Sequence, residues 1–152
     1  MKKLHSAEHT VIPDRIIAST YMAAAAVTGG DVRILDTRAE HITPVIPVFE
    51  QAGCKVDCGE NSVHISAPVR LRSVQTVRTM PYPGFPTDSQ AAVMAMLSVA
   101  HGTSVMIENI FENRYRHVRE LCRLGADIMT EGKVAVIKGV ETLTARACAP
   151  PT

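Results

Sequence analysis

Two segments of the sequence are apolar at almost every position. Residues 16–27 contain the run Tyr-Met-Ala-Ala-Ala-Ala-Val, and residues 91–100 read Ala-Ala-Val-Met-Ala-Met-Leu-Ser-Val-Ala. A helix without a polar face is normally buried on all sides, because any exposed side would place apolar surface in water. We therefore predict two buried helices whose small side chains permit close contact between helices.

The segments around these helices follow the same order in each half of the chain. A short strand precedes the helix, a β-rich run follows it, a second helical pattern ends at a glycine, and a hairpin closes the half. The first half comprises 9–12, 32–35, a pattern ending at Gly53, and 54–58 with 61–66; the second comprises 73–77, 104–107, a pattern ending at Gly125, and 126–130 with 133–137. Each half therefore reads β-α-β-α-β-β.

The two halves are internal repeats, since Asp14 and Asp88 lie 74 residues apart and Gly53 and Gly125 lie 72 residues apart. A period this long marks a supersecondary unit rather than one coil of a solenoid. The predicted fold class is α/β (α+β). Its predicted parts are one repeat unit over 9–70, a second over 71–143, and an irregular tail over 144–152.

Two fully buried helices are a heavy demand on a chain of 152 residues. A domain of this size buries about 68–70% of its unfolded surface, which leaves little chain to wrap both helices. We infer that further material covers them: more copies of the repeat, another subunit, or the rest of a longer chain. The alternative is that the two sheets suffice.

Charge and hydropathy indicate which kinds of partner are not expected for this protein. Lys and Arg total 16 and Asp and Glu total 15, so the net charge is +1, without the basic excess of nucleic-acid or acidic-membrane binders. The longest apolar run, 21–27, is seven residues, whereas a membrane span needs about 20. Met1-Lys2-Lys3 is followed by polar residues rather than the apolar stretch of a leader. We expect a cytoplasmic protein with no nucleic-acid partner and no membrane partner.

The four cysteines are Cys54, Cys58, Cys122 and Cys148, and reduced thiols are expected in the cytoplasm. Cys54 and Cys58 have metal-like spacing, but four residues along a predicted strand span about 13 Å. That separation is too long for two sulfurs that each lie ~2.3 Å from one zinc ion. We predict buried structural thiols here, and we expect neither a metal nor a cofactor.

A stiff, proline-rich loop precedes the second buried helix. Residues 78–90 contain Pro81, Pro83 and Pro86, which prevent regular sheet pairing and deliver Thr87 and Asp88 to the start of the helix. Asp88 has two interpretations: a helix cap that meets the dipole, or a carboxylate beside an apolar wall that acts as a base. The matching Asp14, preceded by Pro13, favours a shared capping role, whereas the longer loop at Asp88 favours an added one.

A second polar cluster, residues 108–117, follows a predicted strand and precedes a helix, where α/β proteins often place ligand contacts. Arg114, Arg116 and Arg119 suit an anion such as a pyrophosphate, although Arg116 and Arg119 equally suit a solvated helix face. His117 is expected to be packed or exposed rather than catalytic. The sequence matches no glycine-rich phosphate-binding fingerprint.

Three stretches resemble the UDP-N-acetylglucosamine enolpyruvyl transferase family. They are His9-Thr-Val-Ile-Pro-Asp-Arg-Ile16, Val77-Arg-Thr-Met-Pro-Tyr-Pro-Gly-Phe-Pro-Thr-Asp-Ser-Gln-Ala91 and Glu108-Asn-Ile-Phe-Glu-Asn-Arg-Tyr115, and the resemblance covers roughly 8–145. The related shikimate-pathway transferases share the fold, but these motifs point away from them. The resemblance implies an inside-out barrel of six repeat units, three in each of two domains, with helices inside and sheets outside. Residues 1–152 would then be a partial domain, a fragment of about two of the six units.

The resemblance also implies an activity. The family transfers enolpyruvyl from phosphoenolpyruvate to the 3-hydroxyl of UDP-N-acetylglucosamine in peptidoglycan synthesis, releasing phosphate through a tetrahedral intermediate and using no cofactor. By motif, Asp88 matches the aspartate proposed as the base for this hydroxyl, Thr87 and the backbone of Ile110 match nucleotide-sugar contacts, and Arg114 lies near the same site. Arg15 belongs to a Pro-Asp-Arg segment that faces the cleft between domains. The family continues this segment with Ile-Glu, whereas this chain has Ile16-Ile17.

The resemblance further implies that the phosphoenolpyruvate half of the site is missing. The family's lysine-asparagine pair and its mobile loop lie in units that this sequence does not contain, and no Asp-Leu-Arg-Ala segment follows Leu143. Positioning effects of this kind are worth ~7–11 kcal/mol, so we expect negligible turnover by the chain alone and phosphoenolpyruvate binding only with the missing units. The alternative is a free-standing nucleotide-sugar-binding or self-assembling module that associates through its apolar helices and performs no catalysis.

Overall fold

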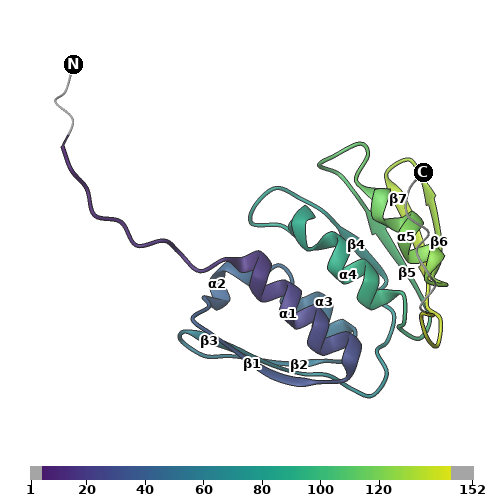
Figure 1. Cartoon of the computed structure of the whole chain (residues 1–152), viewed down its shortest axis with the longest axis horizontal. Helices are drawn as coiled ribbons and strands as arrows, with labels where there is room; N and C mark the ends of the chain where they lie inside the picture. The colour runs from purple at the N-terminus through teal and green to yellow at the C-terminus, as the bar shows by residue number, and fades with distance from the viewer. Residues whose placement is uncertain (1–4, 145–152) are drawn as a thin grey trace.

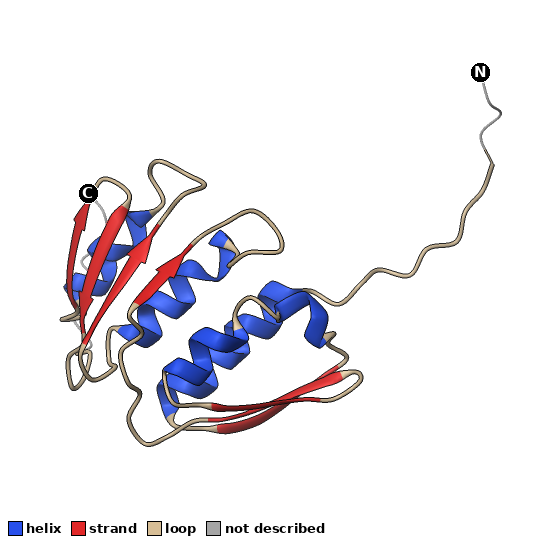
Figure 2. Cartoon of the chain, turned by 180° about the vertical axis from the view of Figure 1, so that it is seen from behind, coloured by secondary structure: helices blue, strands red, loops and turns tan. Residues whose placement is uncertain are grey.

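The computed structural model describes residues 5–144, which form two β-sheets with helices packed between them (Figures 1 and 2). The first half contains α1 (Arg15–Thr28), β1 (Asp31–Leu35), α2 (Ala39–Ile42), α3 (Ile46–Gln51), β2 (Lys55–Cys58) and β3 (Ser62–Ser66). The second half contains β4 (Thr76–Arg78), α4 (Gln90–Leu97), β5 (Thr103–Ile107), α5 (Val118–Arg123), β6 (Asp127–Glu131) and β7 (Val134–Lys138), with 3₁₀ turns at Thr87–Ser89 and Tyr115–His117. Within these residues no helix is both long enough and apolar enough to span a membrane.

The sheets confirm the internal repeat. The first sheet has the strand order β1-β3-β2 and is antiparallel, and the second has the order β4-β5-β7-β6. The strands that the two sheets have in common pair in the same register. Asp31 pairs with Ser66 in the first sheet, and the residues 72 positions later, Thr103 and Lys138, pair in the second. The mixed α/β fold is therefore as predicted, and the predicted order of helices and strands repeats from the central helix of each half onward.

The predicted strand at 9–12 is wrong. This segment has no regular structure and extends away from the body of the protein (Figure 1), with Val11 84% exposed. In the second half, β4 pairs parallel with β5 and is held by a preceding segment in which Leu71 and Val74 are buried. Residues 5–12 are all exposed and lack such anchors, and a lone short strand gains too little from pairing to offset its ordering entropy.

The two central helices pack side by side (Figure 1), but they differ in burial. Helix α4 is largely buried, since Val93, Met94 and Leu97 are at most 1% exposed and Ala91 alone in this helix is exposed. Helix α1 buries Met22 and four of its five alanines, yet Ala24 and Tyr21 on the opposite face are exposed, Tyr21 by 60%. The first sheet and α4 cover only one side of α1, so the alternative that the two sheets suffice is wrong, and the open face agrees with the expectation that further material covers this helix.

The cysteine predictions are partly corrected. Cys54 is buried just before β2, and burial raises the pKa of its thiol to about 11. Cys58 is exposed rather than buried, because it ends β2, which lies at the edge of its sheet. Cys148, residues 1–4 and the predicted tail from residue 145 onward lie outside the described residues.

Candidate functional site

The proline-rich loop folds back on itself before α4. The amide of Met80 donates to the carbonyl of Phe85 at 3.0 Å, and that of Gly84 donates to Pro81 at 2.8 Å. Phe85 is buried, so the loop is fastened to the core at its end. It leads directly into the Thr87–Ser89 turn, which places Asp88 immediately before α4.

Asp88 does not cap the helix that follows it. Its Oδ1 accepts a hydrogen bond from Arg114 Nη2 at 2.9 Å, and its side chain is 56% exposed. The matching Asp14 does cap: its Oδ1 accepts from the amides of Ile16 at 2.7 Å and Ile17 at 3.4 Å. The two repeat-related aspartates therefore have different roles, and a shared capping role is excluded for Asp88.

Arg114 brings the second polar cluster to Asp88. Its guanidinium pairs with Asp88 and lies 5.4 Å from the centre of the Phe111 ring. Arg116 instead lines a separate hollow with Thr130 and Gly132 beside the β6–β7 turn. The structure thus joins Arg114 alone of the three arginines to the candidate base, and it leaves Arg119 exposed on α5.

Glu108 is a buried charge at the centre of this region. The residue is 1% exposed, and its carboxylate accepts five hydrogen bonds from neighbouring segments. The donors are Thr79 Oγ1 (2.8 Å), Thr87 Oγ1 (2.8 Å), Gln90 Nε2 (2.7 Å) and the amides of Ile110 (2.7 Å) and Phe111 (3.1 Å). Burial alone would raise the pKa of Glu108, but the hydrogen bonds outweigh burial and hold the pKa below its ordinary value.

These contacts limit what two predicted site residues offer to a ligand. The hydroxyl of Thr87 already donates to Glu108, which leaves that oxygen as an acceptor. The amide of Ile110 is also occupied by Glu108. Among residues 5–144 no donor reaches the carbonyl oxygen of Ile110, so that oxygen is its available backbone group.

Arg15 lies apart from the Asp88–Arg114 pair but close to the same loop. It is in the first turn of α1, and its guanidinium lies 5.4 Å from the centre of the Tyr82 ring. With Pro13 and His41 it lines a cavity of about 520 Å³. The start of α1 is tied to the Thr87–Ser89 turn by a buried 2.8 Å contact between the hydroxyls of Ser19 and Ser89.

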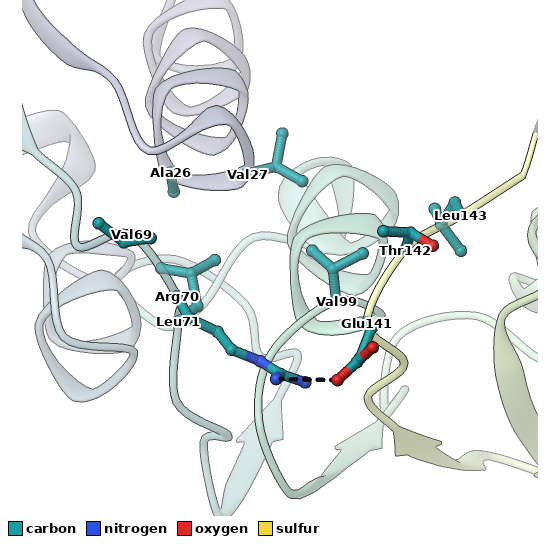
Figure 3. Close-up of a pocket in the computed structure, with 9 residues that line it drawn as sticks. All are labelled: Ala26, Val27, Val69, Arg70, Leu71, Val99, Glu141, Thr142 and Leu143. Carbon is teal, nitrogen blue, oxygen red and sulfur yellow. Dashed lines mark ion pairs between the residues drawn. The ribbon is translucent and has the colours of Figure 1, made fainter.

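A second cavity, of about 530 Å³, lies at the other end of the central helices (Figure 3). Val27 from the last turn of α1, Val99 after α4, and Leu143 line it, and Arg70 and Glu141 form a 3.8 Å ion pair across its edge. Asp88 stands before α4 and Val99 follows it, so this cavity is separate from the candidate site.

The sequence reasoning missed the role of Glu108. The one sequence feature that pointed to Glu108 was its position directly after a β-rich run. That position indicated the polar cluster of residues 108–117, but it did not indicate that the Glu108 carboxylate is buried. His117 is half-buried, and burial lowers the pKa of its imidazole. Within the described part of the chain, no three His, Cys, Asp or Glu side chains gather closely enough to hold a metal ion.

Comparison with known proteins identifies the family. A family model for EPSP synthase (3-phosphoshikimate 1-carboxyvinyltransferase) matches residues 1–149. The chain belongs to the EPSP synthase family. Two solved structures of this family's fold are similar to it: the enolpyruvyl transferase NikO from Streptomyces tendae (TM-score 0.75, 24% identity, 86% of this chain and 31% of that one) and EPSP synthase from Acinetobacter baumannii (TM-score 0.60, 15% identity, 86% and 30%).

Within the EPSP synthase family, the chain is similar to proteins named UDP-N-acetylglucosamine 1-carboxyvinyltransferase. It is 49% identical over 144 residues to the protein from Geotalea daltonii and 50% identical over 145 residues to that from Psychrobacter arcticus. Both matches cover 95% of this chain and 34% of the relative. The resemblance inferred from the motifs is confirmed, and the chain spans about a third of the length of these relatives.

The different roles of Asp14 and Asp88 predict different stability effects. Asp14→Ala should lower the free energy of unfolding by about 1 kcal/mol, because two amides of α1 lose their cap. Asp88→Ala should lower it by less than about 0.5 kcal/mol, because an exposed ion pair contributes little. Urea unfolding monitored by circular dichroism measures both values, and equal losses would contradict the assignment.

The hydrogen bonds to Glu108 predict a dependence of stability on pH. Because the folded pKa lies below the ordinary value of 4.5, the stabilisation is complete above that pH and is lost as the pH falls through the folded pKa. Glu108→Gln does not titrate. The difference in unfolding free energy between wild type and Glu108→Gln should therefore shrink between pH 7 and pH 3, and a constant difference in urea unfolding would show that Glu108 does not titrate in this way.

Proposed function

We propose that this chain forms the acceptor-sugar side of an enolpyruvyl transferase site, which moves enolpyruvyl from phosphoenolpyruvate to the 3-hydroxyl of UDP-N-acetylglucosamine in peptidoglycan synthesis. Identity of 46–50% over 95% of the chain to proteins named for this sugar nucleotide supports the proposal. The observation that carries it is the Asp88 carboxylate, which is exposed, free of a capping role and fixed by Arg114.

In the proposed reaction, Asp88 accepts the proton of the 3-hydroxyl. The hydroxyl oxygen bonds to C2 of phosphoenolpyruvate while C3 gains a proton, which gives a tetrahedral intermediate. Loss of a proton from C3 and cleavage of the bond between C2 and the phosphate oxygen then restore the double bond and release phosphate. Arg114 donates to Oδ1 of Asp88, and no described residue donates a hydrogen bond to Oδ2, so Oδ2 is the oxygen assigned to the substrate.

The neighbouring residues are assigned to the nucleotide sugar. The Thr87 oxygen and the Ile110 carbonyl are acceptors for sugar or base donors, and Arg114 can also face a phosphate. Arg15 is assigned to the cleft between domains, beside the Tyr82 ring. Ile17, which stands where the family has a glutamate, is 57% exposed, so this side of the proposed cleft is apolar.

The contacts to phosphoenolpyruvate are assigned to parts of the transferase beyond this third of its length. We accordingly propose negligible turnover by the chain alone. The cytoplasm is the proposed location, which the unpaired state of Cys54, Cys58 and Cys122 supports.

A hybrid enzyme tests the proposed function. This chain replaces the matching third of the Geotalea daltonii relative, and phosphate release is measured with both substrates. The hybrid should be active, the isolated chain inactive, and Asp88→Asn in the hybrid should lower kcat by about 10²–10⁴-fold through loss of the base. Asp127→Asn, an exposed change on β6, is the control. An inactive hybrid, or full activity of Asp88→Asn, would refute the proposal.

The open face of α1 favours a second property, self-association. Ile17, Tyr21 and Val27 are 57%, 60% and 43% exposed on that helix, and contiguous exposed apolar surface marks protein contacts. We expect the 16.4 kDa chain to form homo-oligomers in solution. Light scattering should show Tyr21→Glu to be a monomer, whereas Met129→Glu on β6 stays associated. A monomeric wild type would exclude this property.

A further inference from the structure

Glu108 is a buried carboxylate that the proposed reaction does not use. It follows β5 directly, and its own amide donates to the carbonyl of Lys133 at 2.8 Å, which fixes its backbone to the turn before β7. Its side chain then points away from water, at 1% exposure, toward the loops that carry the candidate site. A charge in such a place costs free energy unless donors surround it.

Each carboxylate oxygen of Glu108 serves different segments. Oε1 accepts from Thr79, which follows β4, and from the amides of Ile110 and Phe111. Oε2 accepts from Thr87 and Gln90, on either side of the turn that leads into α4. The distance between these two oxygens is fixed by covalent geometry, so it also fixes the separation of the Thr87 turn from the Ile110 loop.

These two segments carry the residues assigned to the sugar. Asp88 is the neighbour of Thr87, and Arg114 lies four residues beyond Ile110 in the same loop. The 2.9 Å contact between Asp88 and Arg114 joins the two segments at the surface. Glu108 joins the same two segments in the interior. A displacement of either segment would move the base relative to the Ile110 carbonyl.

A carboxylate suits this position because it only accepts hydrogen bonds: it offers about four lone-pair sites, so Oε2 has one for each of its two donors and the three donors to Oε1 share two. Glutamine has the same length and one oxygen fewer. The Oε1 of Gln90 is buried and has no partner among the described residues, so a turned Gln90 amide can accept from a glutamine at 108. Aspartate keeps the charge, but it is one methylene shorter and cannot reach both segments.

We propose that Glu108 is a positioning residue of the acceptor site, whose two carboxylate oxygens hold the Asp88 turn and the Ile110 loop at the separation that aligns the sugar. This inference rests on the proposed function for the identity of the ligand. The spacing itself requires no ligand.

The first test uses the full chain without ligand. Amide hydrogen exchange at Ile110 and Phe111, read by NMR, should quicken at least about tenfold in Glu108→Asp and stay near wild type in Glu108→Gln. Val63→Ala, which changes a fully buried residue in the first sheet, is the control for a general loss of stability. In this variant the amides of Ile110 and Phe111 should exchange more slowly than in Glu108→Asp. Unchanged exchange in Glu108→Asp overturns the proposal.

The second test uses the hybrid enzyme with the same variants. Glu108→Asp should raise the KM for UDP-N-acetylglucosamine about tenfold and leave the KM for phosphoenolpyruvate within twofold of wild type. Glu108→Gln should bring the KM for UDP-N-acetylglucosamine most of the way back to the wild-type value. An active wild-type hybrid in which Glu108→Asp shifts both KM values equally, or neither, overturns the positioning role alone. An inactive wild-type hybrid refutes the proposed function and with it the assignment to the sugar.

Discussion

A single buried carboxylate constrains the functional end of this protein. Glu108 can stay ionised away from water only if its donors are supplied together, and they come from the end of β4, the start of α4 and the loop after β5. Those segments are separate in sequence, so satisfying this one charge requires β4 and β5 to be in register and the start of α4 to lie beside them. The exposed pair of Asp88 and Arg114 lies on top of this buried network and takes its position from it.

The two repeats show how a shared scaffold acquires a site in one copy. Their strands pair in the same register, and both central helices begin just after an aspartate. In the first copy, Asp14 follows Pro13 directly and its side chain satisfies the helix amides. In the second copy, a closed loop and a 3₁₀ turn precede the helix, so Asp88 is displaced from the capping position and becomes available to Arg114. The proline-rich loop before α4, rather than the strands and helices common to both repeats, therefore accounts for the different role of Asp88.

Local patterns predicted much of this fold. The two apolar helices, the glycine helix ends and the two hairpins lie where the sequence pattern predicted them. Each of these features is determined by residues that are close together in the sequence. Features set by distant partners were predicted wrongly: Val11 lacks a strand to pair with, and Cys58 ends an edge strand and is exposed. The position of Asp88 followed from its loop, but Glu108 became visible only when Thr79, Thr87 and Ile110 were seen around it.

The missing fourth strand of the first sheet has a consequence for handling the protein. Strand β1 is the last strand on its side, whereas its counterpart β5 is covered by β4. The outer amides and carbonyls of β1 are therefore offered to any extended chain, and Val32 and Leu35 are exposed along it. At high concentration such an edge recruits strands from neighbouring molecules, so the outer side of β1 is one place where β-type aggregates of this chain would begin.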